Sequence, residues 1–253
     1  MRTRSALLAA SLAALVQGPA TGHSSEIRIF SANGMREVME DLGPKFERAA
    51  GHKLTISFAT VGVIVQRISS GESADLVIIP QQGVDRLIKD GKAGASTTVA
   101  RSGIGIVIRK GAPRPDVTTP EALKQSFLAA KSITYLDPKA GGTSGVHFMK
   151  VLDRLGISDQ IKLKTLLHPS AKAAGEMVAR GDAEIGINLI QELLPLPGIE
   201  LVGPLPGDLQ LTLVYAAAIM NDTKEATPAR ALVDFLRTPA AAAAIKAKGM
   251  ETN

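Results

Sequence analysis

The chain has no cysteine among its 253 residues, which excludes disulfide bonds and a cysteine-linked lipid anchor. The fold must therefore be stabilised by a buried core, and a 45% apolar content is enough to form one. Tryptophan is also absent, and aromatic residues make up only 3% of the chain. Because aromatic faces are common platforms for sugars and unpaired bases, a large sugar or single-stranded nucleic acid is not an expected ligand.

The charge of the chain is only mildly positive, and it contains no block of five or six basic residues. Without Arg2 and Arg4, 27 basic residues stand against 24 acidic residues. Nucleic-acid-binding proteins usually carry a stronger and more clustered basic charge. We therefore expect no nucleic-acid partner, while a slightly positive cleft for anions is compatible with this composition.

The first 22 residues are typical of a secretory signal peptide. Two arginines precede an apolar run over residues 6–16, and helix breakers and small residues follow. The run is too short to span a bilayer. We expect residues 1–22 to be a signal peptide, with cleavage after Ala20 or Gly22, and the mature protein to be periplasmic without a lipid anchor.

From residue 26 onward, short apolar segments alternate with segments of helical periodicity. "EIRIFSA", "HKLTISFA" and "ADLVIIP" are typical of strands, and apolar residues recur at helical spacing between them. This order predicts right-handed crossovers and a parallel sheet that binds ligands beyond the carboxyl ends of its strands. The later half repeats the pattern, with "SITYLDP", "IKLKTLL" and "AEIGINL" as strands and with Thr119 and Ser170 as helix caps.

Two stretches of the chain have nearly the same pattern. "SSGESADLVIIPQQ" begins at Ser69 and "ARGDAEIGINLIQE" begins at Ala179; in both, a helical pattern ends at a glycine before an acidic step and an apolar strand. Any two strand–helix–strand units share some of this likeness, but the repetition favours two similar lobes around a ligand. Strands near 103–109 and 209–219 would cross between the lobes and form a hinge.

These patterns predict an α/β fold of two lobes, each with a mostly parallel sheet flanked by helices. We expect lobe I to comprise residues 24–105 plus 212–253, and lobe II to comprise residues 106–211. The ligand would lie in the cleft between the lobes and be captured by hinge closure.

Four strand-to-helix junctions are the predicted ligand loops: "SANG", "ATVG", "GGTSG" and the segment around Asn188. Each of the first three presents a hydroxyl and a glycine just before a helix, where unpaired N–H groups and the helix dipole attract an anion. As an alternative, these side chains are simply helix N-caps, and Arg101 forms a surface ion pair. The candidate ligand contacts are Ser31, Ala32, Asn33, Gly34, Thr60, Val61, Gly62, Gly142, Thr143, Ser144, Gly145 and Asn188, with Arg101 as a possible charged partner.

Catalytic motifs are not evident. "GGTSG" lacks the lysine and the spacing of a phosphate-binding P-loop, and no G-x-S-x-G sequence occurs. Ser144 and His147 would lie on one helix as a helical pair, not as an aligned nucleophile and base. The four histidines are scattered without metal-ligand spacing. We therefore predict no catalytic residues, no metal and no cofactor.

The segment "IRIFSANGMREVMEDLGPKFERAAGHKLTISFATVGVIVQRISSGESADLVIIP" resembles the molybdate-binding type of periplasmic solute-binding protein, the receptor component of an ABC importer. The likeness continues to the C-terminus. It implies a type II periplasmic-binding-protein fold with two hinge strands and a ligand in the cleft. It also implies that the ligand passes to an ABC permease in the inner membrane.

The candidate ligand loops depart from the pattern of that family. The family usually has a serine where this chain has Asn33, and it usually has Gly-Ser-Ser-Gly where this chain has "ATVG". Ser31 and Thr60 match the family by position. The set of serine hydroxyls that would hold a tetrahedral oxyanion is thus reduced, so a small di- or tricarboxylate becomes an alternative to molybdate.

Taken together, the sequence predicts a monomeric periplasmic receptor for a small anion, either an oxyanion or a small organic di- or tricarboxylate. It is not predicted to be an enzyme. Two alternatives remain open on the same fold: a periplasmic enzyme, and a protein that presents its ligand to a membrane sensor.

Overall fold

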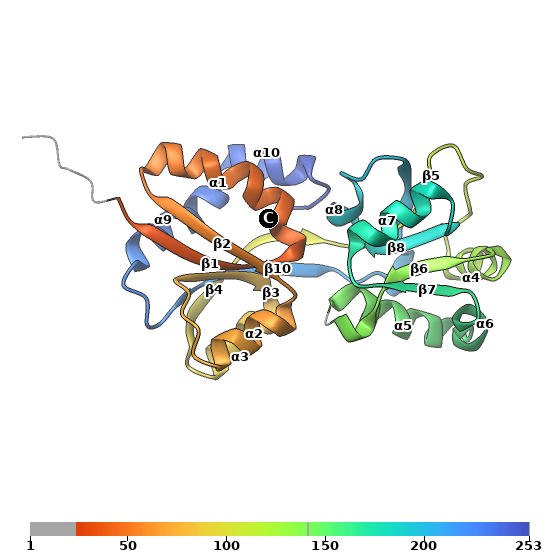
Figure 1. Cartoon of the computed structure of the whole chain (residues 1–253), viewed down its shortest axis with the longest axis horizontal. Helices are drawn as coiled ribbons and strands as arrows, with labels where there is room; N and C mark the ends of the chain where they lie inside the picture. The colour runs from red at the N-terminus through yellow and green to blue at the C-terminus, as the bar shows by residue number, and fades with distance from the viewer. Residues whose placement is uncertain (1–23, 141, 253) are drawn as a thin grey trace, which may run out of the picture.

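The computed structural model describes residues 24–140 and 142–252, so the expected signal peptide over residues 1–22 lies outside the described residues. Two α/β halves lie side by side, each built on its own five-stranded sheet (Figure 1). We name the half with the first sheet lobe I and the half with the second sheet lobe II. In the part of the chain that the structure describes, no helix is long and apolar enough to cross a membrane.

Lobe I has the strand order β2-β1-β3-β10-β4. β1 pairs in parallel with β2 and β3, whereas β10 runs antiparallel between β3 and β4. Helices α1, α9 and α10 cover one face of the sheet, and α2 and α3 cover the other (Figure 1). The bounds are β1 Glu26–Ala32, α1 Arg36–Ala50, β2 Lys53–Ala59, α2 Val61–Ser69, β3 Leu76–Pro80, α3 Gln81–Lys89, β4 Ala93–Ser102, β10 Leu213–Met220, α9 Ala226–Leu236 and α10 Pro239–Ala247.

Lobe II repeats this arrangement in the order β7-β6-β8-β5-β9. β6 pairs in parallel with β7 and β8, and β5 runs antiparallel between β8 and β9. Helices α4, α5 and α6 cover one face, and α7 and α8 cover the other. The bounds are β5 Ile104–Arg109, α4 Pro120–Ala129, β6 Ile133–Leu136, α5 Thr143–Leu155, α6 Ser158–Lys162, β7 Thr165–His168, α7 Ala171–Arg180, β8 Ile185–Leu189, α8 Ile190–Leu193 and β9 Ile199–Pro204.

The matching strand orders confirm the predicted two-lobed α/β fold, with the refinement that each sheet is mixed. The repeated acidic step has the same role in both lobes. Asp75 accepts a hydrogen bond from the backbone N–H of Arg28 at 2.7 Å, and Glu184 accepts one from the backbone N–H of Lys131 at 2.8 Å. In each lobe, the carboxylate before one central strand binds the backbone at the start of its parallel neighbour.

Three features differ from the sequence predictions. β4 and β9 are edge strands whose small residues, polar residues, glycine and proline carry no alternating apolar pattern, so they went unpredicted. The expected strand "IKLKTLL" is only partly correct, because α6 continues to Lys162 with Ile161 fully buried, and β7 begins at Thr165. Finally, the sequence Gly43-Pro44 predicts a kink or an interruption, but α1 continues through both residues.

The chain crosses between the lobes in two places. Only Gly103 separates β4 of lobe I from β5 of lobe II, and the return runs from β9 through a short 3-10 helix, Gly207–Leu209, to β10. We propose that these crossings are the hinge; the first lies at Gly103, just before the boundary after residue 105 expected from the sequence, so all of β5 belongs to lobe II. Polar groups near the crossings therefore link the two lobes.

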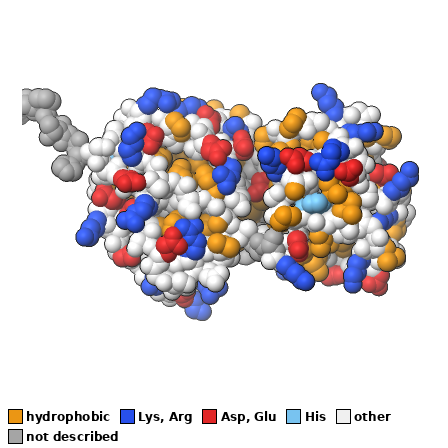
Figure 2. Space-filling view, in the orientation of Figure 1, with side chains coloured by type: hydrophobic (Ala, Val, Ile, Leu, Met, Phe, Trp, Pro, Cys, Tyr) orange, Lys and Arg blue, Asp and Glu red, His pale blue; other side chains and the backbone are white. Residues whose placement is uncertain are grey.

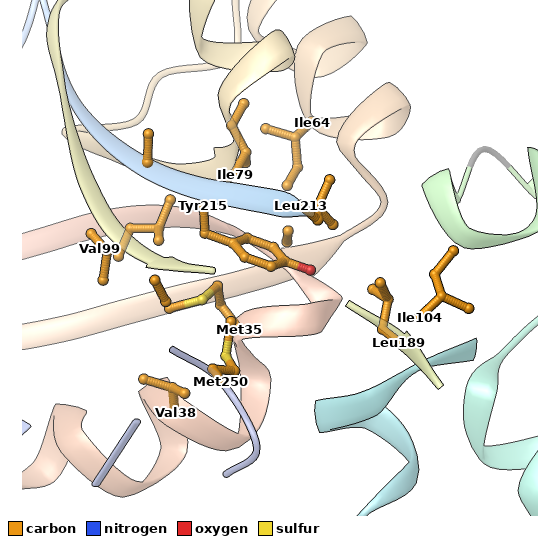
Figure 3. Packing of buried hydrophobic residues seen from close by; sticks show 14 of the residues in the cluster. Met35, Val38, Ile64, Ile79, Val99, Ile104, Leu189, Leu213, Tyr215 and Met250 are labelled. Atoms are coloured by element: carbon orange, nitrogen blue, oxygen red, sulfur yellow. The ribbon is translucent and has the colours of Figure 1, made fainter. Parts of the chain in front are cut away.

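The core of lobe I reaches the lobe boundary at Tyr215. Its ring is fully buried with Met35 and Val99 beside it (Figure 3). The hydroxyl points out of this core, toward the side where Leu189 and Ile104 of lobe II lie (Figure 3). One residue of β10 thus contributes its ring to the lobe I core and its polar end to the space between the lobes.

Candidate functional site

A cavity of about 400 Å³ lies between the lobes, within the groove that Figure 2 shows flanked by acidic and basic side chains. Both lobes contribute to its wall. The wall residues are Ala32, Asn33, Gly34, Arg36, Glu37, Ala59, Thr60, Val61, Pro80, Leu213 and Tyr215 from lobe I, and Leu136, Gly142, Thr143, Ser144, Pro169, Ser170, Ala171, Lys172, Leu189, Glu192, Pro195 and Leu196 from lobe II.

The first predicted loop follows β1 and forms a short 3-10 helix, Asn33–Met35, before α1. Ala32, Asn33 and Gly34 all reach the cavity wall. Gly34 is needed for close packing, because a side chain there would overlap the Tyr215 hydroxyl and lie 2.8 Å from Gln191 Nε2. The loop therefore brings the backbone against the polar end of β10.

The second predicted loop places Thr60 and Val61 in the wall. Thr60 occupies the N-cap position of α2, but its side chain makes no capping hydrogen bond. Its Oγ1 is buried without a hydrogen-bond partner. A buried hydroxyl without a partner is costly, and a ligand at the wall would be able to supply that partner.

The third predicted loop contributes Gly142, Thr143 and Ser144 at the start of α5. The Ser144 hydroxyl donates to Asn188 Oδ1 at 2.8 Å, and the backbone N–H of Leu189 donates to the same oxygen at 2.8 Å. Asn188 is fully buried and lies behind the wall. It therefore holds the Ser144 side chain in place, although its Nδ2 is buried without a partner.

Five predicted contacts are not in the wall: Ser31, Gly62, Gly145, Asn188 and Arg101. Ser31 is fully buried with its hydroxyl 3.5 Å from the Ile78 carbonyl oxygen, and Gly62 is exposed. Gly145 packs against the Leu136 backbone, where a side chain would overlap the carbonyl oxygen. Arg101 lies in β4 and pairs through its backbone with Glu251.

Sequence reasoning missed the charged residues of the wall and Tyr215. Ser170 and Lys172 follow β7 at a fifth strand-to-helix junction, which the same rule could have identified. Ser170 caps α7 by accepting from the Ala173 N–H at 3.2 Å. Tyr215 lies inside an apolar strand, and Glu192 lies on a four-residue helix. Neither carries a local signal, because only the packing of the lobes brings them to the cavity.

Two cationic side chains reach the wall, one from each lobe. The Arg36 guanidinium carbon lies 4.2 Å from the centre of the Phe58 ring, Nη1 is 3.3 Å from Glu40 Oε1, and Nη2 donates to Asn33 Oδ1 at 3.5 Å. Lys172 Nζ is 3.9 Å from Glu176 Oε1. Both ion pairs are exposed, and such pairs contribute little stability, so both cations can turn toward an anion in the cavity.

Glu192 is the acidic group that stands out. In the described parts of the chain its carboxylate has no hydrogen bond and no ion pair, although it is only partly accessible. Burial raises the pKa of this carboxyl to about 7, and the charge of Arg36 acts in the opposite direction. By contrast Glu37, also in the wall, has Lys248 Nζ at 3.7 Å. Glu192 therefore exchanges a proton near neutral pH inside the cavity.

Tyr215 ends a chain of polar side chains that crosses between the lobes. Ser102 of β4 donates to Gln191 Oε1 in lobe II, and Gln191 Nε2 donates to the Tyr215 oxygen at 3.1 Å. Burial and the nearby Glu192 charge raise the pKa of Tyr215, while the hydrogen bond from Gln191 lowers it. The phenol thus keeps its proton and can donate a hydrogen bond into the cavity.

Among residues 24–140 and 142–252, no cluster of three or more His, Asp or Glu side chains could hold a metal ion. The polar side chains of the wall carry hydroxyls, the Asn33 amide, a guanidinium, an ammonium and two carboxylates. Such a set can bind and orient an anion, and Glu192 can also exchange a proton with one.

Comparison with known proteins identifies the family of this chain. A sequence model of the bacterial extracellular solute-binding proteins matches residues 27–251. An aconitate isomerase from Pseudomonas sp is 32% identical over 97% of this chain and 94% of its own length. The molybdate-binding protein ModA of Escherichia coli is 25% identical over 95% of this chain and 94% of its length.

A solved structure with a similar fold is also a molybdate-binding protein. The periplasmic molybdate-binding protein of Azotobacter vinelandii superposes with a TM-score of 0.70 at 19% sequence identity, and the match covers 90% of this chain and 99% of that one. The family model, the relatives and the fold agree with the resemblance seen in the sequence. This chain belongs to the bacterial extracellular solute-binding protein family.

Proposed function

We propose that the protein is a solute-binding receptor that closes its lobes on a small organic anion with two or three carboxylates. The observation that carries this proposal is the cavity between the lobes, where Arg36 comes from one lobe and Lys172 from the other. An anion bound to both cations would hold the lobes together. It would then bind the closed form more tightly than the open form, which is the difference in affinity that hinge closure requires.

The helices around the cavity favour the same charge. α2, α5 and α7 all begin at its wall, beside Thr60, Thr143 and Ser170. The first N–H groups of a helix lack partners within the helix, and the helix dipole favours a negative charge there. The unpaired Thr60 hydroxyl and the Tyr215 phenol add neutral donors.

The size and the apolar part of the wall favour an organic anion over a bare oxyanion. About 400 Å³ lies within the range of roughly 300–1,000 Å³ that small-molecule sites occupy. Leu136, Leu189, Leu196 and Leu213 line the cavity and offer no hydrogen bonds. They would leave the oxygens of a tetrahedral oxyanion without partners, whereas they suit the carbon skeleton of a carboxylate.

Family membership supports the wider role. We propose that the protein acts outside the cytoplasm, in a periplasm, as a monomer, and passes its ligand to an ABC permease in the inner membrane. As such a receptor it would need no catalytic residues, metal or cofactor. The relatives include molybdate-binding proteins, so an oxyanion is the competing ligand class.

Thermal unfolding of the purified protein tests the ligand class. The panel contains molybdate, tungstate, sulfate, phosphate and small di- and tricarboxylates. A ligand at 100 times its Kd stabilises by about 2.7 kcal/mol, which raises the Tm by about 5–10 °C at this chain length. We expect the largest shift with a carboxylate, and we expect Lys172→Ala to reduce it while the exposed Lys224→Ala does not. A shift with molybdate or tungstate alone would refute the carboxylate proposal.

A second function is favoured by Glu192, the unpaired carboxyl in the wall. An anion receptor has no need of such a group, because an ionised carboxylate repels the ligand. The aconitate isomerase relative supports an isomerase that acts on an unsaturated tricarboxylate in the same cavity. Proton NMR of aconitate incubated with the protein tests this directly, since its cis and trans isomers are separate species; no interconversion beyond a protein-free control would exclude it.

A further inference from the structure

We propose that Glu192 is the catalytic residue of this second function and carries one proton between two carbon atoms of a bound unsaturated polycarboxylate. The proposal rests on the carboxylate site proposed above. It assigns a reaction class, a 1,3-proton shift, and the residues that perform it. No cofactor or external reactant is needed, because the proton taken from one carbon is returned to another.

Glu192 is placed for this role by the junction after β8. Asn188 is the second-last residue of that strand and has both of its Oδ1 hydrogen bonds made, and α8 begins two residues later at Ile190. Glu192 then projects to the cavity wall, where Tyr215 of β10 and Arg36 of α1 face it from the other lobe. Closure of the lobes would thus set Glu192 against a ligand held by lobe I.

The charged and titratable groups of this wall differ in whether they have an ion-pair or hydrogen-bond partner. Glu37 of α1 is paired with Lys248, and Lys172 of α7 lies near Glu176. Tyr215 accepts from Gln191. Among the described wall residues, Glu192 is the carboxyl that has no partner, so it is the base with free access to a ligand C–H bond.

The proton affinity of Glu192 suits a group that must both take and return a proton. Its pKa of about 7 lies near neutral pH, where a general base is partly ionised and its conjugate acid is still a useful donor. A ligand carboxylate nearby would raise this pKa further. An ordinary exposed glutamate would be ionised throughout and would be a poor proton donor at the return step.

The proposed step begins with the ligand segment –CH₂–C(COO⁻)=CH–. The Glu192 carboxylate takes a proton from the CH₂ carbon, and the C–H electron pair becomes a new double bond to the central carbon. The π electrons of the old double bond move to the former CH carbon and the carboxylate that it carries. Glu192 then returns its proton to that carbon, so the double bond has moved by one position and the ligand is neither oxidised nor reduced.

The intermediate concentrates negative charge on a ligand carboxylate, and the opposite wall can stabilise it. Arg36 and Lys172 supply positive charge, and the Tyr215 phenol supplies a neutral donor. The hydrogen bond from Gln191, which Ser102 in turn holds, fixes the direction of that phenol. Donors fixed before the reaction stabilise developing charge most effectively. Gln191 and Ser102 are accordingly positioning residues.

The test uses the purified protein with cis- and trans-aconitate in D₂O, followed by proton NMR. We expect the wild-type protein to interconvert the isomers, with deuterium entering only to the extent that protonated Glu192 exchanges with the solvent before it returns its proton. Glu192→Gln should lower this rate by about 100-fold or more, because general acid–base groups contribute about 10²–10⁴-fold. The exposed Glu121→Gln on α4 is the matched control and should keep the wild-type rate.

Binding is measured in parallel so that the two proposals can fail separately. Glu192→Gln should fold and bind the tricarboxylate as tightly as the wild type or more tightly, since it removes a repelling charge, and wild-type kcat/KM should fall below pH 7. Binding without interconversion of the isomers in the wild type would overturn the role of Glu192 and leave the receptor proposal intact. Interconversion undiminished in Glu192→Gln would assign the proton transfer to another group. Absence of carboxylate binding by the wild type would overturn both proposals.

Discussion

Replacing Glu192 with glutamine should stabilise the ligand-free protein at alkaline pH and change it little at acidic pH. Glutamine has nearly the shape of a protonated glutamate and cannot ionise. The substitution therefore removes one property of the residue, the burial of a negative charge without a hydrogen bond or ion pair within the described chain. The effect on unfolding is distinct from any effect on ligand binding.

The size of this effect follows from the pKa of the carboxyl in the two states. It is about 7 in the folded protein against 4.5 for an unperturbed glutamate. Because the folded-state pKa is the higher one, the stability that Glu192 contributes is complete below about pH 4.5 and is lost as the pH rises through 7. One pKa unit corresponds to about 1.4 kcal/mol, so the full loss is about 3 kcal/mol.

Urea unfolding at pH 5 and at pH 8.5 measures the loss. We expect the stability of Glu192→Gln relative to wild type to increase by about 2–3 kcal/mol between these two pH values. With an m-value of about 3 kcal/mol/M, the difference in midpoint would change by about 1 M. Glu121→Gln, at an exposed position on α4, serves as the control for the general effect of removing an acidic residue.

Parallel pH profiles for wild type and Glu192→Gln would refute the reasoning. They would mean that Glu192 has an ordinary pKa in the free protein and that water solvates its carboxylate within the cavity. A gain of equal size for Glu121→Gln would also refute it, because the gain would then reflect net charge and not the burial of one carboxyl.

Three further substitutions have defined outcomes. Gly145→Ala should destabilise by about 1–3 kcal/mol in urea unfolding, because its Cβ would overlap the Leu136 carbonyl oxygen; an unchanged midpoint would contradict the packing. Thr60→Val should leave the unfolding free energy within about 1 kcal/mol, since the hydroxyl has no partner, yet weaken carboxylate binding about tenfold by calorimetry. Asn188→Ala should cost about 2–3 kcal/mol in thermal unfolding by leaving the Ser144 hydroxyl without its acceptor.

Much of the fold could be predicted because each lobe repeats one local pattern. The acidic step at Asp75 and Glu184 marks equivalent strand starts, and the helix caps at Thr119 and Ser170 accept the expected N–H groups. The edge strand β4 escaped prediction for the opposite reason. β4 has one neighbour and a largely polar sequence, so its conformation is set by pairing with β10, far along the chain.

The candidate site divides in the same way. Junctions after strands are visible in a sequence, and three predicted loops reach the cavity through Asn33, Thr60 and Thr143. Tyr215 and Glu192 have no such signature. Tyr215 lies inside a strand, and Glu192 follows a buried amide. The charge of Glu192 acts on Tyr215 only because the lobes meet there. Local patterns locate the donors around a cleft, whereas the chemistry within it depends on which side chains the opposite lobe supplies.

The position of β10 has a consequence for how the chain acquires its fold during synthesis. β10 is the last strand of the chain, yet it lies between β3 and β4 and is the neighbour that joins β4 to the rest of its sheet. The sheet of lobe II, by contrast, is complete once β9 has been made. When the chain becomes available from its N-terminus onward, lobe II has all its strands while lobe I still lacks one. The half of the molecule that begins first is therefore the half that finishes last, and the cleft takes shape only as the final strand is added.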